Sequence, residues 1–257
     1  MNFIIRRFWL GAMMTASLLG CAWGAEGVGV AEVRVKAEAG DADSQELLGH
    51  IYGIGRFVPQ DYAEAARWTR KAAEQGVAEA QYNLGLKYGK GEGVPKDYAE
   101  AVKWYRKAAE QGNADAQYLL GYMYDKGKGV TKDAVEAEKW YRKAAEQGVA
   151  GAQINLGALY ANGDGVPKDY AEAAKWNRKA ADQGSDTAQH KLGVAYLLGL
   201  GVPKDFVQAH VWLNLAAAAG IENARDLLRI VERDMSAEQK AEAMKLAREL
   251  FAKLPKK

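Results

Sequence analysis

Residues 77–112, VAEAQYNLGLKYGKGEGVPKDYAEAVKWYRKAAEQG, hold the pattern that decides the fold. In its first half, Leu84, Gly85 and Tyr88 fall on one side of a helix predicted over about 78–90. Glycine inside a helix costs about 1 kcal/mol relative to alanine. The glycine at this position therefore indicates that another helix approaches the backbone closely.

The second half predicts a second helix with a clear beginning and end. Asp97 is an N-cap candidate, and Glu100 follows at the spacing of a capping box. Gly112 suits the left-handed residue that ends a helix. The predicted buried face consists of Ala101, Trp104, Tyr105 and Ala108.

This helix pair recurs every 36 residues without an insertion. The register is carried by Trp68, Trp104, Trp140, Trp176 and Trp212. One such pair cannot bury its apolar face alone, whereas stacked neighbours form a continuous core. The sequence therefore predicts an all-α solenoid. Its five repeats are expected at 41–76, 77–112, 113–148, 149–184 and 185–220, together 41–220.

The segments that flank the repeats are interpreted as caps. Residues 25–40 resemble a frayed second helix and form a predicted N-terminal capping segment. Residues 221–257 are expected to form C-terminal capping helices, the last of which begins at Ser236 in a capping box with Gln239.

The first 24 residues, 1–24, are interpreted as an export signal. Arg6 and Arg7 precede an apolar stretch that is too short to span a bilayer. Cleavage before Ala25 is one interpretation. The other is a lipoprotein signal over 1–20, in which Cys21, the one cysteine of the chain, receives the lipid. Either way we expect an exported protein that is periplasmic, lipid-anchored to the outer membrane, or secreted.

Two motifs resemble those of the Sel-one-like repeat (SLR) family, which is related to the tetratricopeptide repeats. They are A-x-A-Q-Y-x-L-G-x-x-Y-x-x-G over 78–91 and G-V-P-K-D-Y-x-E-A-x-x-W-x-x-K-A-A-x-Q-G over 93–112. The resemblance implies a right-handed α/α superhelical solenoid of helix-turn-helix repeats and an adaptor role in protein complexes. Some exported relatives carry a cysteine pair in each repeat and have been called β-lactamases. The repeats of this chain contain no cysteine.

Several function classes find no support in the residues. The net charge of +2 includes Arg6 and Arg7 of the signal, so no basic surplus remains for nucleic acid. No serine is followed three residues later by lysine, and the three histidines His50, His190 and His210 lack metal-ligand spacing. We therefore assign no catalytic, cofactor or metal residues and predict a protein that is not an enzyme and has no cofactor.

Positions that vary between repeats are the candidates for recognition. In helix-pair solenoids the first helices commonly line the concave surface, and the sector of those helices opposite Leu84 and Tyr88 mixes apolar with polar residues. The predicted groove residues are Leu47, His50, Ile54, Asn83, Leu86, Lys90, Leu119, Tyr122, Lys126, Asn155, Lys191, Val194 and Leu198.

The leading hypothesis is a monomeric interaction scaffold that binds a protein or peptide in this groove. It contacts a membrane only through a lipid on Cys21. The alternatives are an envelope hydrolase of cell-wall or β-lactam substrates and a secreted effector that binds host proteins.

Overall fold

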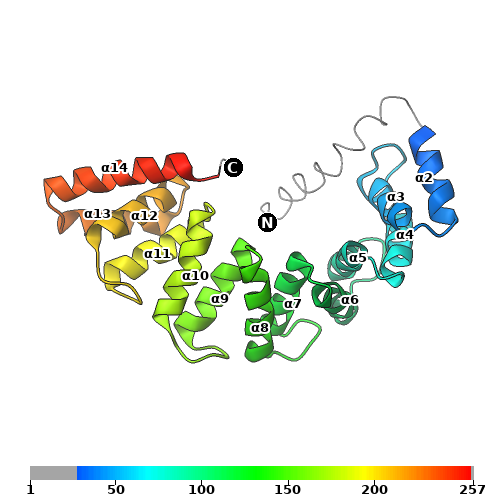
Figure 1. The fold of residues 1–257 in the computed structure, drawn as a ribbon, viewed down its shortest axis with the longest axis horizontal. Coiled ribbons are helices and arrows are strands. Elements are labelled where there is room, and N and C mark those ends of the chain that lie inside the picture. The colour runs from blue at the N-terminus through cyan, green and yellow to red at the C-terminus, as the bar shows by residue number, and fades with distance from the viewer. Residues whose placement is uncertain (1–27, 256–257) are drawn as a thin grey trace. The chain divides into compact units, whose positions relative to one another are not determined.

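The computed structural model describes residues 28–255, so the predicted signal and Cys21 lie outside the described residues. Within that range the chain forms thirteen helices and no strand (Figure 1). The predicted all-helical class is confirmed. The chain divides after Asp97 into two compact units, which are described separately.

The first unit contains four helices. They are α2 (Val28–Glu38), α3 (Ala42–Ile54), α4 (Tyr62–Glu74) and α5 (Ala78–Lys90). Each packs against the next in the chain, so α3 and α4 form a helix pair that lies between α2 and α5.

The second unit continues the alternation of first and second helices. It contains α6 (Tyr98–Glu110), α7 (Ala114–Lys126), α8 (Ala134–Glu146), α9 (Ala150–Asn162), α10 (Tyr170–Asp182), α11 (Asp186–Leu198), α12 (Phe206–Ala218), α13 (Glu222–Arg233) and α14 (Ala237–Lys253). Successive helices pack against each other up to α13, whereas α14 packs against α12.

The second helices begin at capping aspartates, as predicted. Asp61 accepts hydrogen bonds from the backbone N–H groups of Ala63 and Glu64, and Asp133 and Asp169 repeat this geometry. The predicted capping box is only half right. The Glu64 carboxylate accepts from the indole Nε1 of Trp68 at 3.1 Å. Glu136 does the same for Trp140. In α4 and α8 this glutamate therefore satisfies the buried tryptophan of its own helix, whereas Nε1 of Trp176 in α10 has no hydrogen-bond partner within the described residues. The full capping box predicted at Ser236 is confirmed.

Where both helices of a repeat lie in one unit, the glycine inside the first helix lies against the second helix. A Cβ on Gly49 would lie 2.5 Å from Oγ1 of Thr69, and one on Gly121 would lie 2.7 Å from Cδ1 of Tyr141. Gly193 meets Leu213 at the same distance. The predicted close approach of the two helices is confirmed, because no larger residue fits without moving a neighbour.

A glycine in the connecting loop joins successive repeats. Gly201 has φ of +71°, and a Cβ there would lie 2.0 Å from the carbonyl oxygen of Tyr170 in the preceding repeat. Glycine serves both needs, since it adopts this conformation without strain and leaves room for the backbone. The loop is thus a packing element.

A buried glutamine connects neighbouring repeats on the first helices. Gln153 donates to the carbonyl of Ala145 at the end of α8, and its side-chain oxygen accepts from Gln183 at the end of α10. Gln45 makes the equivalent pair of bonds to Ala37 and Gln75. These bonds satisfy carbonyls that a helix end leaves without an intrahelical partner.

The tryptophans that set the register are core residues. Trp68, Trp104, Trp140, Trp176 and Trp212 are between 1 and 8 % exposed. A lysine three residues later covers the ring in four repeats; Lys71, for example, lies 4.1 Å from the centroid of Trp68. The packing interpretation of these tryptophans is confirmed.

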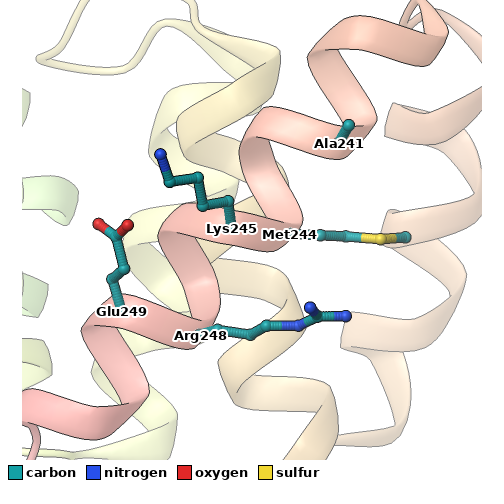
Figure 2. Close-up of a pocket in the computed structure, with 5 residues that line it drawn as sticks. All are labelled: Ala241, Met244, Lys245, Arg248 and Glu249. Atoms are coloured by element: carbon teal, nitrogen blue, oxygen red, sulfur yellow. The ribbon is translucent and has the colours of Figure 1, made fainter.

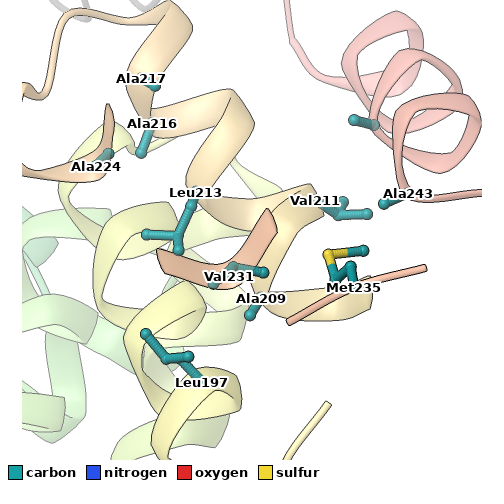
Figure 3. Packing of buried hydrophobic residues seen from close by; sticks show 11 residues of the cluster. Leu197, Ala209, Val211, Leu213, Ala216, Ala217, Ala224, Val231, Met235 and Ala243 are labelled. Atoms are coloured by element: carbon teal, nitrogen blue, oxygen red, sulfur yellow. The ribbon is translucent and has the colours of Figure 1, made fainter. Parts of the chain in front are cut away.

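The C-terminal cap is built around α12, which is mostly apolar and carries buried residues on most of its circumference. Figure 3 shows Val211 directed toward Ala243 of α14, while Leu213 points to the other side of α12. His210 is fully buried, and its Nε2 lies 3.1 Å from a carboxylate oxygen of Glu232 on α13. Both α13 and α14 thus complete the core of the last repeat.

Candidate binding surface on the first helices

The first helices carry the predicted groove residues at or near the surface. In the first unit, α3 and α5 present Leu47, His50, Ile54, Asn83, Leu86 and Lys90, and in the second unit α7, α9 and α11 present Leu119, Tyr122, Lys126, Asn155, Lys191, Val194 and Leu198. None of these side chains is fully buried. They form two sets, one on each unit, and each set is accessible to a partner.

Some members of each set also support the core. Leu47 packs against the cluster of Val30, Leu48 and Trp68, so only part of its surface is free. Tyr122 packs against a cluster of buried residues from α8, α9 and α10. At the other extreme, Ile54 is 50 % exposed and Leu198 is 61 % exposed. These two aliphatic side chains are therefore available to contact a partner.

A further position at the junction between adjacent first helices was missed by the sequence analysis. Glu46 of α3 accepts a hydrogen bond from Nδ2 of Asn83 in α5 at 3.3 Å. In the second unit, Tyr118 of α7 stands at the position of Glu46, and its hydroxyl interacts with the side chain of Asn155 in α9. The signal was present in the sequence, since these pairs lie 37 residues apart and recur with the repeat.

The first unit concentrates partly buried charges on this face. Burial, reinforced by the charge of Glu79, raises the pKa of Glu46 to about 7. Burial followed by the charge of Lys87 lowers the pKa of His50, and burial lowers the pKa of Lys87. Desolvated groups like these gain more from a charged partner than groups in water do.

Tyrosines dominate the corresponding face of the second unit. The rings of Tyr118 and Tyr141 lie 6.0 Å apart, and burial raises the pKa of both hydroxyls. Lys128 lies 5.1 Å from the centroid of Tyr122 and 3.3 Å from its hydroxyl. Partly exposed tyrosines held by their neighbours are typical anchors of protein interfaces, because they bury much area at little entropic cost.

Two hollows lie on the described surface. One of about 370 Å³ lies along α14 and is lined by that helix alone. Figure 2 shows Met244 and Arg248 extending to one side of α14, away from Lys245 and Glu249. A second hollow, of about 490 Å³, lies along α6 near Trp104, and its Glu100 is paired with Lys103. Neither brings an acid and a base from different elements to a common point.

Two further findings apply to residues 28–255. Within this range no cluster of histidine, cysteine and carboxylate side chains could hold a metal ion. The helices of the same range are too short or too polar to cross a bilayer.

Comparison with known proteins gives one family. A model described as the Sel1 repeat matches residues 42–77, 78–113, 114–149, 150–185 and 186–221. A search of curated proteins finds no match.

Two solved structures show the same architecture. A Sel1 repeat protein from Oxalobacter formigenes is 37 % identical with a TM-score of 0.71, over 82 % of this chain and 88 % of that one. The protein c5321, a protective antigen of uropathogenic Escherichia coli with an SLR fold, is 35 % identical with a TM-score of 0.58. That match covers 88 % of this chain and 56 % of the antigen.

Proposed function

The chain belongs to the Sel1 repeat family, whose members are generally protein-interaction scaffolds, and we propose that its first-helix faces bind a segment of a partner protein. The similarity to Sel1 repeat proteins favours a non-enzymatic role. The partner is proposed to bind a monomer of the chain, as an extended strand or an amphipathic helix.

The observation that carries this proposal is the composition of the first-helix face in the second unit. Tyr122 is half-buried between Lys128 and the core, Lys126 is exposed one turn further along α7, and Leu198 is exposed on α11. An aromatic anchor, an exposed charge and an exposed aliphatic side chain together provide the contacts that an interface core and rim require.

The test begins with crosslinking of the chain in cells of the producing organism, followed by mass spectrometry of the attached proteins. Binding of a purified partner is then measured for Tyr122→Ala, Lys126→Glu and Lys90→Glu. We expect Tyr122→Ala to weaken binding by about tenfold or more, since truncating an anchor costs at least about 2 kcal/mol. Each charge reversal should weaken binding mainly at low salt.

Lys175→Glu provides the matched control, because Lys175 is exposed on the second helix α10. Circular dichroism should show unchanged helix content for every variant. Full affinity of all three groove variants for a crosslinked partner would show that the first-helix faces are not the binding surface.

We further propose that the chain is exported, either with a lipid on Cys21 or after cleavage before Ala25. The charged start and apolar stretch of the first 24 residues support export. Labelling cells with a palmitate analogue distinguishes the two forms. A lipoprotein takes up the label in the wild type and loses it in Cys21→Ala, whereas a cleaved protein is unlabelled and begins at Ala25. A chain that keeps Met1 and stays in the cytoplasm would contradict export.

A further inference from the structure

Adjacent first helices are joined by a polar pair at two junctions of the solenoid. Glu46 pairs with Asn83 in the first unit, and Tyr118 pairs with Asn155 in the second. In both cases the earlier helix offers an oxygen and the later helix offers an amide. The hydrogen bond between Asn83 and Glu46 satisfies two partly buried polar groups, and the hydroxyl of Tyr118 has a polar neighbour in Asn155.

The next junction of the second unit departs from this rule. One repeat further on, Ile154 stands at the position of Tyr118, and Lys191 stands at the position of Asn155. Ile154 packs against the core of α10 to α12 and has no polar atom in its side chain. Lys191 has thus replaced an amide beside a residue that offers it no acceptor.

The amine of Lys191 makes no hydrogen bond or ion pair within the described residues. The side chain is half-buried, and burial alone lowers the pKa of its ammonium group. The adjacent His190 offers no compensation, because its Nε2 is buried without a hydrogen-bond partner, and its pKa is also lowered, first by burial and then by Lys191. A cation in such surroundings gains much from an anion brought by another molecule.

Lys191 lies at one end of an apolar strip on the same helix. Val194 follows one turn later and Leu198 follows a further turn along α11. At about 1.5 Å per residue, Lys191 and Leu198 are separated by about 10 Å along the helix, which about three residues of an extended chain span.

We propose that Lys191 binds a side-chain carboxylate of the partner segment, and that an apolar side chain within about three residues of it packs on Val194 and Leu198. The partner is therefore a polypeptide segment with an acidic residue close to an apolar one. This inference rests on the proposed function and adds the chemistry of the partner to it.

The test selects phage-displayed random dodecapeptides on the full chain. A selected peptide is synthesised with a fluorescent label in two forms, one with its glutamate or aspartate and one with the corresponding amide. Fluorescence anisotropy then measures both forms on the wild type and on Lys191→Gln. The acidic form should bind the wild type between about tenfold and about a hundredfold more tightly than Lys191→Gln, as expected for a hydrogen bond to a charged group. The amide form should bind both proteins equally, which isolates the contact.

Lys168→Gln is the matched control, since Lys168 is an exposed lysine in the loop before α10. It should leave the binding of both peptides unchanged. Circular dichroism and thermal melting establish that Lys191→Gln is folded.

Each other outcome contradicts a different proposal. Peptides that lose binding in Tyr122→Ala or Leu198→Ala but show no acidic preference, or bind Lys191→Gln as tightly as wild type, overturn the role of Lys191 and leave the binding surface intact. A selection in which no peptide depends on Tyr122 or Leu198 overturns the proposed function and this inference with it.

Discussion

At the scale of single residues, the helix glycines set how closely the two helices of a repeat approach. A Cβ on Gly121 would lie 2.7 Å from the ring of Tyr141, which is fully buried and cannot move aside. A Cβ on Gly29 in α2 would have no neighbouring atom within 4 Å. We expect Gly121→Ala to destabilise the chain by about 1–3 kcal/mol through overpacking. The same change at Gly29 should stabilise the chain by about 0.5 kcal/mol, because alanine has the higher helix propensity.

Urea unfolding of both variants checks the sign of each effect. The pair is informative because the chemical change is identical and only the surroundings differ. A stabilised Gly121→Ala would mean that Tyr141 can repack, and that the repeat glycine reflects something other than close helix contact.

Glu46 predicts a pH dependence of stability. Burial, then the charge of Glu79, raises its pKa in the folded chain from the ordinary 4.5 to about 7. Between these values the folded chain holds a proton that the unfolded chain has released, so Glu46 costs stability as the pH rises through about 7. After a discount for its partial exposure, we expect an effect on the order of 1 kcal/mol.

The measurement compares the wild type with Glu46→Gln at about pH 5 and about pH 8. The wild type should lose stability relative to Glu46→Gln on going to the higher pH. The exposed Glu74→Gln serves as control and should follow the wild type at both values. If the free energy of unfolding changed equally with pH in the wild type and in Glu46→Gln, the raised pKa of Glu46 would be contradicted.

At the scale of elements, the repeats could be predicted from sequence because each signal occurs several times. The helix at Ala78–Lys90 and its buried Leu84 follow from periodicity, and the aspartate and glycine signals mark helix ends. The hydrogen bond that Trp68 donates to Glu64 could not be distinguished from a capping box in the sequence, because both place the glutamate three residues after the aspartate. The contact between Glu46 and Asn83 was not predicted, because a helical wheel describes one helix and these residues lie on two.

The packing of α14 against α12 also lay beyond the sequence. If the repeat pattern continued, α14 would be the second helix of a sixth repeat. It would then pack against the first helix of that repeat, α13. Instead, small residues of α14 such as Ala243 and Ala247 lie against α12, which is mostly apolar and has more residues to bury than the other second helices have. Unrepeated contacts of this kind leave no pattern in one sequence.

This arrangement predicts how the cap fails. Ala243 is fully buried, so Ala243→Glu places an unpaired charge in the interface and should release α14 from α12. Limited trypsin digestion should then cut early at Lys245 and Arg248. Ala241→Glu, on the exposed side of the same helix, should keep the wild-type cleavage rate. Equal protection of both variants would show that α14 does not depend on this contact.

At the scale of the whole molecule, the solenoid is a series of nearest-neighbour contacts, so a complete repeat should be removable. Deleting residues 149–184 joins Gly148 to Ser185 and keeps every position in register, with Ser185 still serving as the N-cap of α11. Two contacts of Tyr118 do not transfer. The deletion places Lys191 at the position of Asn155. Tyr118 lies over Gly151, where a Cβ would be 3.0 Å from its ring, and the deletion places Thr187 there instead.

We therefore expect the deletion variant to fold, with Thr187→Gly raising its thermal midpoint by relieving the clash with Tyr118. In the full chain, Thr187→Gly should lower the midpoint, because Thr187 is exposed there and glycine costs about 0.5 kcal/mol relative to threonine in a helix. Circular dichroism melts of the four proteins test this reversal of sign. The same sign in both backgrounds would mean that the contact between adjacent first helices depends on more than the two neighbouring repeats.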